Sequence, residues 1–240
     1  MRRRNASAST VWMLTVGGVL AMVAIARADP PTTWDFVVET SGQDAFWTSP
    51  TRVSNTADRY YMGYEITLLK VTVKYLIFQF EVDVTNQIPP EQRTGQGFFD
   101  GPPPVAVFDG DVVYPLPPEP PGFSAHVKFG LTAEGYGRAE VTKVYLGTIK
   151  IVIPPYGEVE AQLKKVHIEG KITARPLWNG DLNCDGVTNN FDIDPFVLAL
   201  TDPAGYAQQF PSCDRLLADC NGDAAVDNFD IDPFVKLLTP

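Results

Sequence analysis

Histidine and cysteine are scarce in this chain, and their scarcity disfavours two classes of function. Two histidines and three cysteines are present among 240 residues. A Ser-His-Asp hydrolase would need His126 or His167, and neither lies in a recognisable nucleophile motif. The cysteines, Cys184, Cys213 and Cys220, do not have the spacing of a common zinc site, and no histidine is near them in the sequence. We therefore expect neither a histidine-based catalytic triad nor a zinc centre.

Long apolar runs are also rare. The one long run covers residues 11–25, after Arg2, Arg3 and Arg4 and before the small-residue site Ala26-Arg27-Ala28. This order of a basic start, an apolar stretch and a cleavage site is typical of a secretory signal peptide, so residues 1–28 are expected to be removed from a secreted bacterial protein. The run falls short of the ~20 residues that cross a bilayer, and we expect no membrane span after cleavage.

Basic side chains are scarce in the remainder. Removing residues 1–28 takes away four of the 19 basic residues and none of the 29 acidic ones. That leaves 15 basic against 29 acidic residues, a net charge of −14. Because nucleic acids and anionic membranes attract basic surfaces, we expect neither as a partner.

Residues 29–175 have the patterns of a β-rich domain. Phe78, Phe80 and Val82 alternate with polar residues, which is the period of a half-buried strand. Further strands are expected at 34–39, 60–69, 125–129, 137–144, 149–153 and 166–173, whereas only 158–165 suggests a helix. Two proline-rich stretches, 101–104 and 115–122, are expected to be loops. Short strands without crossover helices predict a mainly β fold, an antiparallel β-sandwich or jelly-roll-like domain.

The composition changes at about residue 176. Residues 178–240 contain eleven aspartates, no glutamate, one arginine and one lysine. Within them, the seven residues from Phe191 to Val197 recur unchanged from Phe229 to Val235, 38 residues later. We therefore expect a second, small all-α domain at 176–240 that contains a duplicated unit.

An oxygen-rich loop precedes each copy of the repeat. Counted from the first aspartate, oxygen side chains fall at positions 1, 3, 5, 9 and 12, and position 7 offers its backbone carbonyl, which is the ligand pattern of an EF-hand loop. The first set is Asp181, Asn183, Asp185, Val187, Asn189 and Asp192, and the second is Asp219, Asn221, Asp223, Ala225, Asp227 and Asp230. Ca²⁺ takes six to eight such oxygens, and the aspartates of each loop would repel one another without a cation. The sequence therefore predicts two Ca²⁺ sites.

Two positions depart from the EF-hand pattern. Position 12 is aspartate where glutamate is usual, and position 6 of the second loop is Ala224 where glycine is usual. Because position 6 often needs a strained turn, the second site is predicted to bind Ca²⁺ more weakly. Asp194 and Asp232 each precede a proline, and we interpret them as helix N-caps rather than as ligands.

The same region is predicted to contain three short helices and one disulfide. Helices are expected at 195–200 and 233–238, with Phe196, Val197 and Leu200 facing Phe234, Val235 and Leu238. Asp202 and Pro203 predict a third helix that ends near Phe210. One disulfide is expected among the three cysteines. The pairing stays open, with a pair that includes Cys184 favoured, because Cys213 and Cys220 would lie about 10 Å apart along a helix.

Two aspartate-rich loops, each followed by one helix, resemble the dockerin domain. The resemblance covers about residues 178–240 and implies calcium-dependent binding to a cohesin domain. In that family, positions 10 and 11 of each loop help to choose the cohesin. These positions are Asn190, Phe191, Asn228 and Phe229. The alternative for the two phenylalanines is a place in the core.

Three functions are compatible with these features. The first is a secreted calcium-binding protein whose dockerin-like module docks to a cohesin-type or other surface partner and displays a non-catalytic β domain. The second is a polysaccharide-binding or polysaccharide-degrading component of glycoside hydrolase type, although no catalytic constellation is visible. The third is a structural protein that its calcium module makes rigid. A sugar platform or a core could be formed by Trp34, Trp47, Tyr60, Tyr61, Phe98 and Phe99.

Overall fold

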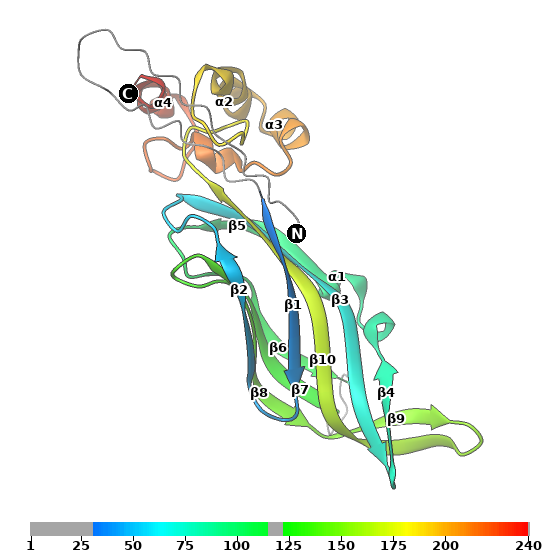
Figure 1. Ribbon diagram of the computed structural model, residues 1–240. Coiled ribbons are helices and arrows are strands. Elements are labelled where there is room, and N and C mark those ends of the chain that lie inside the picture. The colour runs from blue at the N-terminus through cyan, green and yellow to red at the C-terminus, as the bar shows by residue number, and fades with distance from the viewer. Residues whose placement is uncertain (1–30, 115–121, 240) are drawn as a thin grey trace, which may run out of the picture.

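The computed structural model describes residues 31–114 and 122–239. Strand residues make up 51% and helical residues 20%, so the protein is mainly β, as predicted. Figure 1 shows a long body of strands with short helices gathered at one end. The expected signal peptide and most of the proline-rich stretch at 115–122 lie outside the described residues. None of the helices within the described ranges is long and apolar enough to cross a membrane.

Two antiparallel sheets form the body. The larger sheet has the order β1-β10-β3-β4, with β5 also paired to β3 and β9 to β10, and the smaller has the order β2-β8-β7-β6. The strands are β1 Thr32–Thr40, β2 Ala45–Arg52, β3 Arg59–Tyr75, β4 Phe78–Asp83, β5 Thr94–Asp100, β6 Val105–Tyr114, β7 Phe123–Leu131, β8 Tyr136–Leu146, β9 Thr148–Ile153 and β10 Gly157–Leu177. A short 3-10 turn, η1 Thr85–Gln87, and one helical turn, α1 Pro90–Arg93, join β4 to β5.

Inward-facing side chains of both sheets share one core, which is consistent with a β-sandwich. In β1, Trp34, Phe36 and Val38 are buried and alternate with exposed neighbours. Phe36 meets Phe129 of the other sheet with ring centroids 5.2 Å apart. Four of the six aromatic residues considered for a sugar platform belong to this core, namely Trp34, Trp47, Tyr60 and Phe99. A platform of all six is therefore wrong.

Strand β10 corrects the helix suggested at 158–165. Those residues begin a strand of 21 residues that pairs first with β9 and then with both β1 and β3. Ala161 and Leu163 are buried while Gln162 between them is exposed, so the apolar period is two rather than 3.6. In β4 the expected strand is present, but its first residue, Phe78, is 62% exposed. The proline-rich residues 101–104 form bends between β5 and β6, as expected.

Three short helices follow the body: α2 Ile193–Thr201, α3 Pro203–Gln209 and α4 Ile231–Leu238. Asp202 caps α3 as expected, and its side chain accepts from the Gly205 N–H at 2.9 Å. Helices α2 and α4 begin two residues earlier than predicted, and the capping role of Asp194 and Asp232 is wrong. Both aspartates are exposed in the first helical turn. The caps are instead on the preceding 3-10 turns, η2 Asn190–Asp192 and η4 Asn228–Asp230.

A second, smaller core lies beneath these helices. Phe196 of α2 and Phe234 of α4 stack with ring centroids 4.0 Å apart and planes 2° from parallel, as the duplication predicts. Leu200 and Leu238 pack against this core. Placing Val197 and Val235 in it is wrong, because each is 49% exposed. Each of these valines follows its stacked phenylalanine by one residue, and a step of one residue on a helix points away from the buried face.

The C-terminal unit, residues 178–239, rests directly on the end of the body. Arg59 of β3 reaches both Asp100 (2.6 Å) and Asp214 (2.8 Å), and 3-10 turn η3 Arg215–Ala218 follows Asp214. The Asn179 N–H donates to the Asp58 carboxylate at 3.0 Å. Tyr61 and Phe98 of the body contact each other and the second core. Side-chain contacts therefore join the two parts in addition to the chain itself.

Candidate calcium-binding loops

Loop 1, residues 181–192, turns its backbone N–H groups toward its own side-chain oxygens. The Asp181 carboxylate accepts hydrogen bonds from the N–H groups of Asp185 (3.1 Å) and Gly186 (2.8 Å). The Asn183 side chain accepts from Asp185 (2.8 Å), and the Asp185 carboxylate accepts from Val187 (3.0 Å). The first half of the loop is therefore wound around the side chains at positions 1, 3 and 5.

Asp192, at position 12, closes loop 1. Its carboxylate is fully buried and accepts from the N–H groups of Leu182 (2.8 Å), Asn183 (3.0 Å) and Asn189 (2.8 Å). The Asn189 side chain in turn accepts from the Phe191 N–H at 2.7 Å. Position 12 thus ties the beginning of the loop to its end, and position 9 caps the turn that leads into α2.

Loop 2, residues 219–230, repeats most of this pattern 38 residues later. In its first half, the Asp219 carboxylate accepts from the N–H groups of Asp223 (3.1 Å) and Ala224 (2.8 Å). The Asn221 side chain accepts from the Asp223 N–H (2.8 Å), and the Asp223 carboxylate accepts from the Ala225 N–H (2.9 Å). In its second half, the Asp230 carboxylate accepts from the N–H groups of Asn221 (3.1 Å) and Asp227 (2.9 Å), and the Asp227 carboxylate accepts from the Phe229 N–H (2.8 Å). The bond from Leu182 has no equivalent, because the Cys220 N–H donates to the Ala218 carbonyl. All twelve predicted positions therefore lie in two loops of one shape.

Both loops place positions 4 and 6 in the left-handed backbone region. The φ angles are 53° at Cys184 and 87° at Gly186 in loop 1, and 78° at Gly222 and 68° at Ala224 in loop 2. The strained turn expected at Ala224 is present. Each loop thus has one glycine and one residue with a side chain at these positions, and the strain at Cys184 was not anticipated.

The central carboxylates of loop 1 are buried together. Asp181 is 2% exposed and Asp192 is fully buried. Burial, and then the charge of Asp192, raise the pKa of Asp181 to about 6. Burial also raises the pKa of Asp192. Within the described residues neither carboxylate forms an ion pair, so ionising both without a bound cation costs free energy.

The donor set suits Ca²⁺ better than a softer metal. Across residues 31–114 and 122–239, no three His, Cys, Asp or Glu side chains converge as ready metal ligands. The loops instead combine aspartates with asparagine side chains and backbone carbonyls, all of them hard oxygen donors. A carboxylate offers about four lone-pair sites, so Asp181 retains acceptor capacity beyond its two N–H bonds. The Val187 carbonyl, at position 7, accepts from the Asn189 side chain at 3.1 Å.

The predicted partner-binding residues lie at the surface. Phe191 and Phe229 are each 77% exposed, so the alternative that places them in the core is wrong. Asn190 and Asn228 are also exposed. The equal exposure of the two phenylalanines follows from the shared loop shape. Each loop therefore presents one exposed phenylalanine at the same position, 11.

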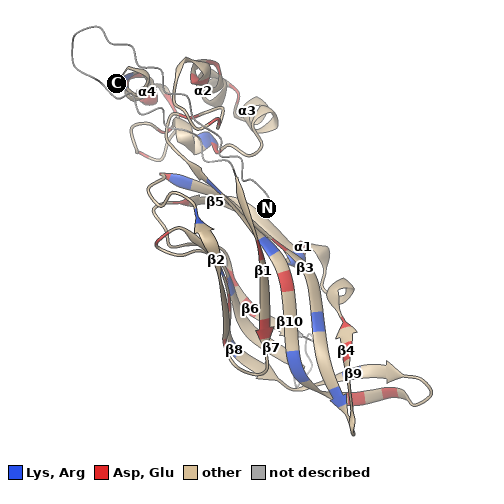
Figure 2. Cartoon of the chain, in the orientation of Figure 1, with Lys and Arg blue, Asp and Glu red and all other residues tan. Residues whose placement is uncertain are grey.

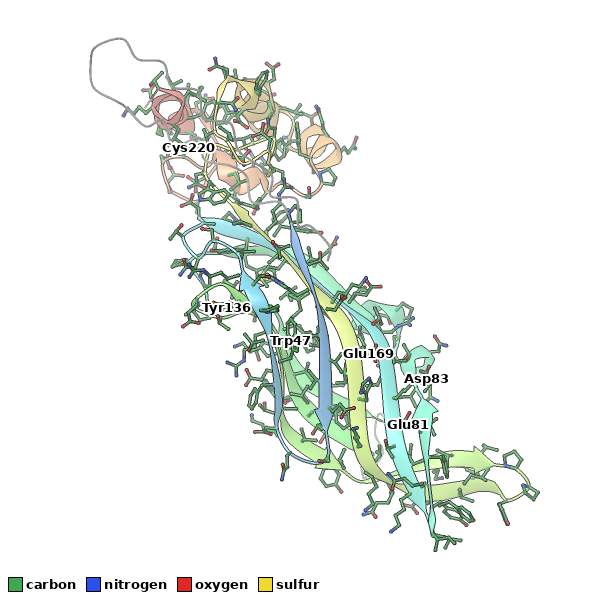
Figure 3. All side chains as sticks on the ribbon, viewed as in Figure 1. Trp47, Glu81, Asp83, Tyr136, Glu169 and Cys220 are labelled. Carbon is green, nitrogen blue, oxygen red and sulfur yellow. A yellow bond between two sulfur atoms is a disulfide. The ribbon has the colours of Figure 1, made fainter. Side chains whose placement is uncertain are left out.

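A disulfide joins Cys184 of loop 1 to Cys213, in the segment between α3 and η3. The pair includes Cys184, as favoured. Cys220, at position 2 of loop 2, is free and lies in the C-terminal unit (Figure 3). Burial and the charges of Asp230 and Asp219 raise the pKa of the Cys220 thiol to about 12, which keeps it protonated. Loop 1 is thus fastened covalently and loop 2 is not.

Two arginines that the sequence analysis did not identify donate hydrogen bonds to backbone carbonyls of the loops. The Arg175 guanidinium donates to the Cys184 carbonyl in loop 1. Arg215 donates to the carbonyls of Ala199 (2.7 Å) and Val226 (3.2 Å), which joins the end of α2 to loop 2. Arg215 is the one arginine in an acidic segment, and that contrast in charge is a sequence signal that could have identified it.

The two histidines lie between carboxylates on the strands. His126 bonds Asp111 (2.9 Å) and Asp109 (2.8 Å), and His167 bonds Glu39 (2.9 Å) and Glu169 (2.7 Å). Hydrogen bonds that the His167 ring donates to Glu169 and Glu39 raise the pKa of His167. These contacts do not form the acid–histidine–nucleophile series of a serine hydrolase.

Comparison with known proteins does not identify a family for this chain. No protein-family model, curated protein or solved structure matches the chain. The nature of the C-terminal unit must therefore be argued from its own loops, their donors and their surroundings.

Proposed function

We propose that this chain is a secreted calcium-binding protein in which a β-sandwich carries a small all-α, dockerin-like module at residues 176–240. The observation that carries the proposal is the repetition of one hydrogen-bond pattern around two aspartate-rich loops. Loop 1 contains three aspartates within twelve residues and loop 2 contains four. A Ca²⁺ ion in each loop would offset their mutual repulsion, and its binding free energy would stabilise the folded module.

In this proposal, calcium binding acts directly on the turns that carry the exposed phenylalanines. Position 9 of each loop, Asn189 or Asp227, caps the turn that carries the exposed phenylalanine. An ion that holds positions 1 to 12 in place also orders Phe191 and Phe229. We infer that this pair docks to a cohesin-type domain or another cell-surface protein, and that the module displays a non-catalytic β domain.

Isothermal titration calorimetry of the mature chain, residues 29–240, tests the calcium sites. We expect two binding events, the weaker at loop 2. The Asp181→Ala, Asp219→Ala double variant removes position 1 from both loops and should abolish the heat of binding. The matched control is Asp194→Ala, Asp232→Ala, which removes two exposed aspartates outside the loops and should leave both events. A flat trace for the unchanged protein would refute calcium binding.

Docking is tested separately with a panel of purified cohesin domains. Binding in calcium should disappear in EDTA, and it should weaken at least about tenfold in the Phe191→Ser, Phe229→Ser variant, because buried aromatic anchors dominate interfaces. Val37→Ser, which alters an apolar side chain 51% exposed on the body, is the control. If every cohesin fails to bind a calcium-loaded protein, the cohesin-type partner is rejected while the calcium sites stand.

A structural role for the module is the second candidate, and the contacts at the junction favour it. Arg59 reaches Asp214 at 2.8 Å, and Tyr61 and Phe98 lie against the second core. In this role, Ca²⁺ raises the unfolding temperature of the β body through these contacts. Arg59→Met should reduce that increase without altering calcium affinity. An increase that is unchanged in Arg59→Met would count against coupling through this ion pair.

A further inference from the structure

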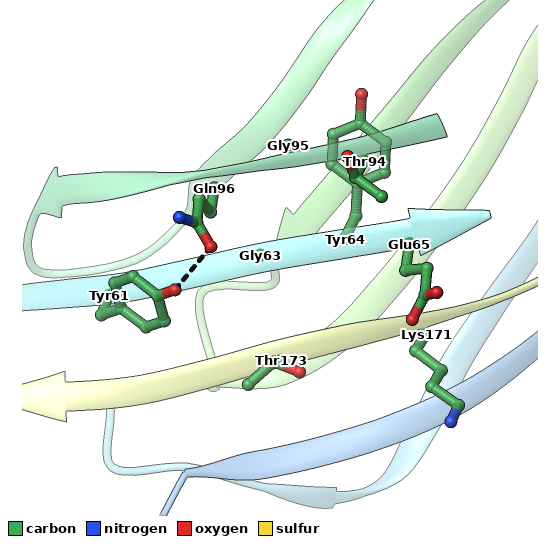
Figure 4. Close-up of a pocket in the computed structure, with 9 residues that line it drawn as sticks. All are labelled: Tyr61, Gly63, Tyr64, Glu65, Thr94, Gly95, Gln96, Lys171 and Thr173. Carbon is green, nitrogen blue, oxygen red and sulfur yellow. Dashed lines mark hydrogen bonds between the residues drawn. The ribbon is translucent and has the colours of Figure 1, made fainter. Parts of the chain in front are cut away.

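The larger sheet is hollowed on its outer face, close to the C-terminal unit. The hollow has a volume of about 540 Å³ and is open to solvent. Figure 4 shows that its side chains come from the neighbouring strands β5, β3 and β10. The lining includes Tyr61, Gly63, Glu65, Gln96, Lys171 and Thr173.

Gly63 makes the floor of this hollow. It lies in β3 directly between Thr173 of β10 and Gln96 of β5. Its neighbours on the same face of β3 are Tyr61 and Glu65, two residues away on either side. A Cβ at Gly63 would meet only ordinary contacts, 3.5 Å from the Gly95 carbonyl oxygen and 3.7 Å from the Gln96 Cβ. Neither packing nor backbone conformation requires glycine there, and its effect is to leave space.

The walls offer an aromatic ring together with donors and acceptors. The Tyr61 hydroxyl donates to the Gln96 side-chain oxygen at 2.8 Å, which leaves the Gln96 amide nitrogen as a donor. Glu65 and Lys171 face each other across the strands, and within the described residues neither forms an ion pair or side-chain hydrogen bond. Basic and acidic positions are also interspersed along β10 (Figure 2). The hollow thus has polar groups of both kinds and no excess of one charge.

We propose that this hollow binds a segment of an uncharged polysaccharide. A sugar presents hydroxyls that both donate and accept, and Lys171, Gln96 and Glu65 supply the complementary groups. A sugar also has an apolar face of C–H groups, which packs on an aromatic ring such as that of Tyr61. The balanced charge does not favour an anionic ligand, and the polar walls do not favour a lipid. This function goes beyond calcium-dependent docking and does not depend on it.

Affinity electrophoresis of the mature chain tests the site. The gels contain, one at a time, xylan, galactomannan, mixed-linkage β-glucan and hydroxyethylcellulose, with calcium present. We expect at least one of them to retard the protein. Gly63→Leu fills the floor and should abolish the retardation, and Tyr61→Ala should weaken it about tenfold through loss of the aromatic contact. Thr72→Leu enlarges another residue of β3 outside the hollow and should have no effect.

Folding and calcium are controlled within the same experiment. Gly63→Ala adds one methyl group at ordinary contact distance and should retain most of the binding, whereas circular dichroism should show that Gly63→Leu is folded. Retardation should persist in EDTA, so loss of the calcium sites and loss of the sugar site are distinguishable. The proposal is overturned if none of the four polysaccharides retards the protein, or if folded Gly63→Leu is retarded as strongly as the unchanged chain.

Discussion

Loop 1 and loop 2 share a backbone shape but have different surroundings. In loop 1, Asp181 is 2% exposed, a disulfide fixes position 4, and the Tyr206 hydroxyl donates to the Leu182 carbonyl at 2.9 Å. In loop 2, residues 221–225 are all exposed, and the cysteine at position 2 is free. Loop 1 is therefore held by its protein neighbours, whereas loop 2 is held mainly by its own hydrogen bonds.

For the proposed calcium sites, this difference separates two contributions to ion affinity. Loop 1 is preorganised, but its Asp181 and Asp192 carboxylates are costly to ionise because they are buried. Loop 2 has four aspartates instead of three and readier access to water, but it has Ala224 in a left-handed conformation. The comparison teaches that two loops with the same ligand spacing need not bind an ion equally well, and four sets of substitutions test it.

The largest expected effect on stability comes from the stacked phenylalanines of α2 and α4, which join the two halves of the C-terminal unit, each made of one loop and its helix. Phe196→Ala and Phe234→Ala each remove one ring of the central stack, and each should lower the free energy of unfolding by about 3–5 kcal/mol. The two values should agree within about 1 kcal/mol, because both rings are 3% exposed. Urea unfolding in saturating calcium measures them. A loss confined to one variant would show that the halves are not equivalent.

The disulfide gives the next effect. The Cys184→Ala, Cys213→Ala variant should lower the free energy of unfolding by about 2–5 kcal/mol and weaken calcium binding at loop 1 only. Calorimetry resolves the two sites. Cys220→Ala is the control, since it removes the free thiol at position 2 of loop 2, which is not a predicted ligand, and should preserve both affinities. Weakening of both sites by the double variant would contradict the independence of the loops.

A pH dependence should appear in the calcium-free protein. The pKa of Asp181 is about 6 in the folded state against 3.8 without the fold, so the folded state holds this proton more tightly. Stability from this group is complete below about pH 4 and is lost as the pH rises through 6, by up to about 3 kcal/mol. Urea unfolding in EDTA should show this decline, and Asp181→Asn should flatten it. A decline that is as steep in Asp181→Asn as in the unchanged protein would refute the assignment.

The smallest effect concerns position 6. Ala224→Gly removes a side chain from a residue with φ of 68°. The change should relieve about 1 kcal/mol of backbone strain and increase the calcium affinity of loop 2 about fivefold. Gly186→Ala is the reciprocal change, at a φ of 87°, and should weaken loop 1 by a similar factor. Calorimetry compares the affinities. If Ala224→Gly leaves loop 2 unchanged, backbone strain is not what distinguishes the sites.

The loops could be located from sequence because their donors lie within twelve residues and repeat. The local spacing fixes which side chains turn inward, whatever the rest of the chain does. The same reasoning did not choose the disulfide, since the approach of Cys184 to Cys213 depends on how α3 folds back. It also did not locate the hollow, whose residues come from three strands that only the sheet brings together.

The body was predicted unevenly for a similar reason. Strands with a clear apolar alternation, such as β1, were predicted, whereas β2, β5 and β6 were not. β2 contains Pro50 and β5 contains Gly95 and Gly97, residues that disfavour strands in isolation. Pairing with β8 and β3 determines the structure of β2 and β5, and pairing with β9 and then β3 likewise makes residues 158–165 a strand.

Strand β10 also determines how the molecule would respond to tension. It is 21 residues long, pairs with β3 over residues 162–177 and with β1 over residues 166–174, and leads within four residues into loop 1. The hydrogen bonds of antiparallel strands are perpendicular to the strands, so a pull on the C-terminal unit along β10 loads them in shear. Many bonds on both sides must then yield together rather than one after another. A module anchored to a surface would thus transmit force into the strongest direction of the body.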